Sequence, residues 1–257
     1  MSVTYMLSGF AVGLLVGLTG VGGGSLMTPL LTLLFGVHPT VAVGTDLAFA
    51  SATKVAGTFA HRYKGNVHWD IVRHLCIGAL PAAVLTTLAL KYFGGLGDEI
   101  GHIIRYSIAG SVMLTVIALI FRRHIQNWVN ARPERQLQGN KLIAATIISG
   151  LILGTLVTIS SIGAGAIGAT ILVLLYPRLS PAEIAGTDIA YAVPLTAIAA
   201  LGHWWLGSIN WELLTALLLG SIPGITLGSL VSRAIPEKLL RVLLASVLTT
   251  VAVKLVY

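Results

Sequence analysis

The chain carries one residue pattern twice, so its fold has to place two similar units. Gly44-Thr45-Asp46 returns as Gly186-Thr187-Asp188, 142 residues later. The same separation relates further pairs: His61 and His203, Gly65 and Gly207, Trp69 and Trp211, Gly78 and Gly220, and Pro81 and Pro223. Upstream, residues 21–25 match residues 162–166 at a separation of 141, which places one added residue near 176–181. Each copy therefore contains a glycine-rich segment and a polar motif.

Composition indicates that these copies lie in a membrane. Of the residues, 56% are hydrophobic and 10% are charged, whereas soluble domains carry roughly 25% charged residues. Runs long enough to cross the ~30 Å hydrocarbon core occur at 42–60, 71–90, 103–121, 184–202, 212–232 and 239–257. Two longer runs, 5–35 and 142–176, are interrupted by glycine. The sequence predicts an all-α polytopic membrane protein with eight to ten helical segments.

The net charge of +7 comes from basic residues in short loops beside the apolar runs. This is the positive-inside pattern of membrane proteins, so no nucleic-acid partner is predicted. The most cationic connector, residues 122–141, is predicted to be a cytoplasmic linker. It separates a first repeat at 1–121 from a second at 142–257, and the two form one integrated transport domain.

Equivalent loops of the two copies carry opposite charge bias. The connector after the His61 run holds Arg62 and Lys64, whereas its counterpart at 206–212 has no basic residue. Loops with opposite bias face opposite sides of the membrane. The sequence therefore predicts repeats of inverted topology, which requires an odd number of crossings in each copy.

That parity constrains the two glycine-interrupted runs. Each copy already has three ordinary spans, so each interrupted run is predicted to be a hairpin of two short helices, about 14 residues or ~21 Å each. The alternative is a single broken helix that crosses once, which gives four spans per copy and a parallel repeat.

The glycine breaks are candidate binding sites. Backbone N–H groups exposed at membrane depth cost several kcal/mol each unless they are satisfied. Each break precedes a short helix whose N-terminus attracts anions. Facing breaks would form one anion site, with these binding residues: Thr19, Gly22, Gly23, Gly24 and Ser25 in the first copy, and Ser161, Gly163, Ala164 and Gly165 in the second. Glycines spaced by four, such as Gly9 and Gly13, are interpreted as helix packing.

Ionisable groups within apolar runs are the second set of candidates. Thr45, Asp46, Thr187 and Asp188 either cap and complement a helix start or supply carboxylates that bind a proton and order the site. In the capping interpretation, a helix begun at Ser180 is interrupted at Gly186.

Three more ionisable side chains fall inside or at the end of an apolar run. His61 and His203 end equivalent runs, and each is either an interfacial residue or a proton relay. Lys54, whose counterpart is Thr196, either contacts a substrate anion or extends to the membrane edge.

Several of these residues carry a family resemblance. Gly-Leu-Thr-Gly-Val-Gly-Gly-Gly-Ser at 17–25, Pro29, Val-Gly-Thr-Asp-Leu at 43–47 and Lys64, Gly65 and Val67 resemble the sulfite exporter TauE/SafE family, the toluene sulfonate uptake permeases. The resemblance implies a secondary transporter of small sulfur-containing anions, driven by the proton gradient. The second copy departs from the pattern at Ala164 and Ala166.

Together these features predict a proton-coupled carrier of sulfite, thiosulfate, sulfoacetate or another organosulfonate in the bacterial inner membrane. It would work by alternating access around the two breaks. The alternatives are an anion channel, a membrane assembly protein and an intramembrane enzyme. The sequence has no H-E-x-x-H motif, so catalysis, metal binding and cofactors are not predicted. The expected partners are the sulfur anion and the lipid bilayer, and a homodimer is left open.

Overall fold

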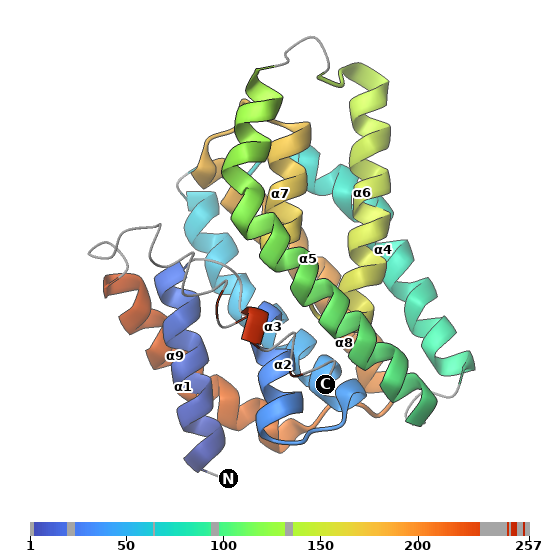
Figure 1. Cartoon of the computed structure of the whole chain (residues 1–257), viewed down its shortest axis with the longest axis vertical. Coiled ribbons are helices and arrows are strands. Elements are labelled where there is room, and N and C mark those ends of the chain that lie inside the picture. Colours follow the sequence, from blue (N-terminus) through green and yellow to red (C-terminus); the bar gives the residue numbers. More distant parts are fainter. Residues whose placement is uncertain are drawn as a thin grey trace.

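The computed structural model describes residues 3–19, 24–63, 65–93, 98–131 and 136–231, together with 246, 248–250 and 254. Within these ranges the chain is helical (Figure 1). In chain order the helices are α1 (Val3–Thr19), α2 (Gly24–Leu34), α3 (Pro39–Tyr63), α4 (Trp69–Tyr92), α5 (Asp98–Asn130), α6 (Gly139–Ser160), α7 (Ala166–Leu175), α8 (Pro181–Trp205) and α9 (Trp211–Val231).

Five of these helices are long and apolar enough to cross a membrane. They are α4, α6 and α8, with the segments Ile100–Phe121 of α5 and Trp211–Gly228 of α9. Helix α3 matches α8 in length, at 25 residues, but is more polar. The predicted all-helical polytopic class is confirmed. The predicted span at 239–257 lies almost entirely outside the described residues.

Both glycine-interrupted runs fold back on themselves. The rings of Tyr5 at the start of α1 and Phe35 just after α2 pack edge to face, 4.9 Å between centroids. In the second copy, Thr146 Oγ1 and Tyr176 Oη lie 2.7 Å apart and join the start of α6 to the end of α7. Each residue of the second pair lies 141 positions after its counterpart in the first. The predicted hairpins are therefore present, and the single-crossing alternative is wrong.

Three details of the prediction need correction. The hairpin arms are unequal, since α6 has 22 residues and α7 has 10. Helix α5 continues to Asn130, because no helix-breaking residue follows the apolar run, so the predicted linker begins as helix. Helix α8 begins after its N-cap Ser180 and runs through Gly186 without a break, so the predicted interruption at Gly186 is wrong.

Glycines set the packing between the two copies. A Cβ on Gly9 or Gly13 of α1 would overlap the backbone of Leu217 or Ser221 in α9. In the same way, a Cβ on Gly150 or Gly154 of α6 would overlap Leu75 or Ala79 in α4. The α1–α9 and α6–α4 contacts join residues that are equivalent in the repeat, so each hairpin packs on the opposite copy. Small residues permit this close approach.

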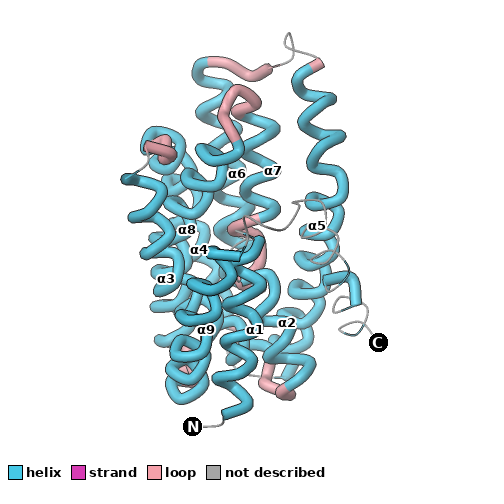
Figure 2. The backbone as a smooth tube through the Cα atoms, turned by 90° about the vertical axis from the view of Figure 1, so that its left-hand side faces the viewer, coloured by secondary structure: helices cyan, strands magenta, loops and turns pink. Residues whose placement is uncertain are grey.

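Helices α3 and α8 cross between the copies in opposite directions. Gly44, near the start of α3, lies against His203 and Ser208 at the end of α8, while Gly186, near the start of α8, lies against His61 and Asn66 at the end of α3. The loops gather at the two ends of the bundle, and the loop between α6 and α7 lies at mid-height (Figure 2). Non-helical backbone is thereby placed halfway along the bundle.

Candidate functional site

The break between α6 and α7 has an unusual backbone. Helix α6 ends at Ser160, and its C-cap Ser161 adopts a left-handed conformation with φ 58°. Gly163 and Gly165 follow with φ 133° and 138°, a region that side chains rarely tolerate. A non-glycine residue at positive φ costs of order 1–3 kcal/mol and is found preferentially at functional sites. Ser161 is such a residue, and it is buried.

Helix α3 directs a lysine at this break. Lys54 is 6% exposed, and its Nζ donates a hydrogen bond of 3.2 Å to the carbonyl oxygen of Ala164. It also interacts electrostatically with Asp188 and Asp46. The interpretation that Lys54 extends to the membrane edge is therefore wrong. A lysine from the first copy instead contributes a positive charge to the glycine break of the second.

Asp46 lies on α3, two turns before Lys54, and is held by α2, the short helix of the hairpin in the same copy. Its Oδ2 accepts hydrogen bonds from the hydroxyl of Thr28 and, at 3.2 Å, from the Thr28 backbone N–H. The Ser161 hydroxyl lies beside Asp46. Asp46 thus links α2, α3 and the second break.

Asp188 of α8 occupies the equivalent place in the second copy. A Cβ on Gly168, the third residue of α7, would overlap Asp188 Oδ1 and would lie 3.0 Å from Tyr191 Oη. Asp188 is 3% exposed and Tyr191 is fully buried. The absence of a side chain at Gly168 therefore lets a carboxylate and a phenol approach the first turn of α7.

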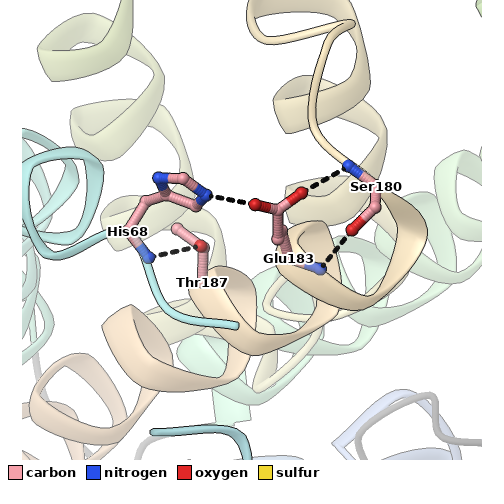
Figure 3. Close-up of polar contacts among 4 residues, drawn as sticks. All are labelled: His68, Ser180, Glu183 and Thr187. Carbon is pink, nitrogen blue, oxygen red and sulfur yellow. Dashed lines mark hydrogen bonds and ion pairs between the residues drawn. The ribbon is translucent and has the colours of Figure 1, made fainter. Parts of the chain in front are cut away.

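Thr45 and Thr187 hold loops rather than helix ends. Thr187 Oγ1 accepts a hydrogen bond from His68 N, and His68 Nε2 lies 2.9 Å from Glu183 Oε1 (Figure 3). Glu183 completes a capping box with Ser180. In the other copy, Thr45 Oγ1 accepts from Asn210 N, 142 residues after the His68 donor. The prediction that Thr45 and Thr187 cap helices is wrong, because both lie inside a helix and bind the loop of the opposite copy.

The two histidines differ in environment. His203 is fully buried, and its Nε2 donates to the carbonyl oxygen of Thr158, 2.9 Å away in the last turn of α6. Its Nδ1 lies 2.9 Å from Ser208 Oγ. The interfacial interpretation is therefore wrong for His203, which joins α8 to the helix that ends at the break. His61 is only partly buried.

The first break is less fully described. Gly22 and Gly23 lie outside the described residues, as do the side chains of Thr19 and Ser25, and α2 begins at Gly24. What can be placed are the second break and the side chains around it. Gly168 and Tyr191 belong to this group although they were not predicted.

The described site residues are enclosed. Two grooves in the described part of the surface have volumes of ≈ 600 and ≈ 350 Å³, and no predicted site residue lines either of them. The larger groove lies between α5 and α6 and has an apolar lining. Lys54 and Asp188 are themselves buried.

Buried ionisable groups that meet at a helix break define a class, the polytopic membrane transporters. The chain belongs to the sulfite exporter TauE/SafE family, because the family model of that description matches residues 5–255. Membership confirms the family resemblance of the sequence and makes the chain a multi-pass membrane transporter.

Curated relatives support the same class. The chain is 35% identical to the probable membrane transporter protein YjnA of Bacillus subtilis, over the full length of both. It is 27% identical to the probable membrane transporter protein YdhB of the same organism, over 90% of this chain and 91% of the relative. A probable membrane transporter protein of Xylella fastidiosa is 26% identical over 88% and 82%. No solved structure matches the chain significantly.

Proposed function

We propose that this chain is a proton-coupled secondary transporter of small sulfur-containing anions in the bacterial inner membrane. Its substrate would be sulfite, thiosulfate, sulfoacetate or another organosulfonate. The observation that carries the proposal is Lys54, a buried cation that donates to the carbonyl of Ala164 inside a helix break. Asp188 and Asp46 lie close enough to balance the Lys54 charge, and an anionic substrate takes over that role when one of these carboxylates is protonated.

The anion would bind between Lys54 and the N-terminus of α7. Helix geometry leaves the N–H groups of Ala166 and Ile167 without an acceptor inside α7, and the helix dipole is positive at that end. The hydroxyl of Ser161 adds a neutral donor close by. One lysine and neutral donors suit a small singly charged anion, such as hydrogensulfite or a simple sulfonate, better than thiosulfate, sulfoacetate or a phosphate ester, which carry two or more charges.

Alternating access would use the contacts between the copies. Helices α3 and α8 are antiparallel, and each begins against the loop at which the other ends. The Thr187–His68 and Thr45–Asn210 hydrogen bonds therefore lie at opposite ends of the bundle. An inverted repeat of this kind can open one end while the other stays closed.

The decisive experiment is flux into proteoliposomes. Purified protein should accumulate labelled sulfite, thiosulfate or sulfoacetate when a pH gradient is imposed, and uptake should saturate. Flux that does not saturate and ignores the gradient would identify a channel. Absence of flux for all three anions would contradict the proposal.

Lys54→Met tests the site itself. Losing one charge-assisted hydrogen bond should weaken binding by about tenfold to a hundredfold. The matched control is Lys91→Met, since Lys91 packs over the Trp205 ring at 3.2 Å, away from the break, and should bind as the parent does. Equal loss in both variants would show a general charge effect and no site at Lys54.

A further inference from the structure

Both buried aspartates lie near the N-terminal end of a short helix, where the substrate anion is also expected. Asp46 accepts from the Thr28 N–H in α2, and Asp188 Oδ1 contacts Gly168 in the first turn of α7. A carboxylate at a helix N-terminus is stabilised by the same N–H groups and dipole that stabilise a bound oxyanion. In α7, Asp188 therefore lies beside the turn at which a substrate oxyanion is expected.

A second observation marks the α7 turn as a binding site. Tyr191 is fully buried, and its hydroxyl has no hydrogen-bond partner among the described residues. That hydroxyl lies 3.0 Å from the Cβ position of Gly168, on the same turn that Asp188 contacts. A buried hydroxyl without a partner is costly to keep, so the phenol is available to donate to a ligand.

This arrangement is specific to the second copy. Phe49 stands where the repeat places Tyr191, and Met27 stands where it places Gly168. The first copy therefore lacks both the hydroxyl donor and the space beside the helix. Packing alone does not require a hydroxyl at position 191. Phe49, which has none, is as fully buried in the first copy as Tyr191 is in the second.

We propose that the first turn of α7 is an oxyanion subsite that the Asp188 carboxylate and the substrate occupy in turn, with Tyr191 donating to the substrate. The proposal rests on the transport function above and adds the residue that couples it to protons. A hydronium ion from the aqueous side transfers its proton to Asp188, so one O–H bond of that ion breaks, one forms on the carboxylate, and water leaves. The neutral acid then leaves the turn to the anion.

Charge balance favours this exchange. Lys54, Asp46 and Asp188 carry one positive and two negative charges when they are ionised. Protonating Asp188 removes one negative charge, and a bound monoanion restores it. The buried cluster keeps the same net charge with and without substrate, which avoids the cost of adding an uncompensated charge to a membrane interior.

The other ionisable groups near Asp188 are few. Those that face the Asp188 and Tyr191 pair from the packed helices are Lys54 and Asp46 of α3 and Cys76 of α4. Helix α7 has no ionisable side chain, and α6 has only Lys141, at its opposite end. Asp46 is already held by two hydrogen bonds from Thr28. Asp188 is the carboxylate assigned to the proton because it is the one that contacts the first turn of α7, where the substrate anion is expected.

The test is calorimetric titration of the purified full chain with methanesulfonate and sulfoacetate in two buffers of different ionisation enthalpy. The sulfonate group stays ionised from about pH 5 to 8, and methanesulfonate has no other ionisable group, so proton uptake with that ligand belongs to the protein. The parent should take up about one proton per anion near neutral pH, and Asp188→Asn should take up none and bind with an affinity independent of pH.

Tyr191→Phe is the companion variant, because it installs the residue that the first copy already has. It should fold as the parent does and bind about tenfold to a hundredfold more weakly. Tyr176→Phe, which removes a hydroxyl bonded to Thr146 outside the site, should bind as tightly as the parent. Neither this comparison nor proton uptake by the parent depends on Asp188→Asn folding.

The outcomes separate the two proposals. If the parent binds a sulfonate and needs Lys54, but Tyr191→Phe binds equally well or binding takes up no proton, the α7 subsite is overturned and the transport proposal stands. If the parent binds neither sulfonate nor sulfite nor thiosulfate, the transport proposal fails and the subsite fails with it.

Discussion

The two copies build the same contact between an aspartate and a short helix, but they complete it differently. In the first copy Asp46 is fixed by the hydroxyl and N–H of Thr28. In the second, Ala169 stands at the Thr28 position and offers no hydroxyl, and Asp188 meets Gly168 and Tyr191 instead. A duplicated scaffold can thus keep one copy as a rigid support while the other acquires the groups that bind and release an ion.

The comparison first requires that the copies have opposite orientations. Tyr63 and Trp205 are repeat equivalents at the ends of α3 and α8, and both are exposed. Cysteines placed at these positions, in a Cys76→Ala background, should react with a membrane-impermeant reagent from opposite sides. The expected difference is all or none, because α3 and α8 are antiparallel. Labelling of both positions from one side would break the inverted-repeat account.

The support role of the first copy predicts a stability effect. Thr28→Val removes one donor to a buried carboxylate and should lower the free energy of unfolding by about 1.5–3 kcal/mol. Thr32→Val is the matched control, because the Thr32 hydroxyl bonds only within its own helix, to the Thr28 carbonyl. Thermal unfolding in detergent compares the two variants. Equal stability of both would mean that Thr28 does not fix Asp46.

The smallest effect is expected at the loop contacts. One copy holds its loop with a hydrogen bond of 2.9 Å between His68 Nε2 and Glu183 Oε1, whereas Asn210 and Val41 stand at the equivalent positions in the other. Glu183→Gln keeps the capping box but removes the charge. Because both side chains are partly exposed, the loss of stability should be smaller than that of Thr28→Val. A loss as large as that of Thr28→Val would show that this loop contact has a greater role than its counterpart.

The repeat in the sequence predicted the hairpins because their limits follow from glycines and apolar runs. It also located Lys54, Asp46 and Asp188, since charges stand out in an apolar chain. Their depth and partners were not predictable, because these depend on how α3 crosses the second break.

Gly168 and Tyr191 were missed for a related reason. A glycine or tyrosine in an apolar helix resembles ordinary packing until its neighbours are known. One signal was available: Tyr191 follows Asp188 by three residues, so both lie on the same helix face. Comparing the copies at Phe49 and Met27 would have drawn attention to the same turn.

The central claim is that the anion binds where Lys54 meets the first turn of α7. An experimental structure with selenite, the heavy analogue of sulfite, would locate the ion by anomalous scattering. The account predicts a selenium peak within hydrogen-bond reach of Lys54 Nζ and of the α7 N-terminus, with the Tyr191 hydroxyl directed at it. A peak elsewhere, such as the groove between α5 and α6, with Lys54 still bonded to the Ala164 carbonyl, would contradict it.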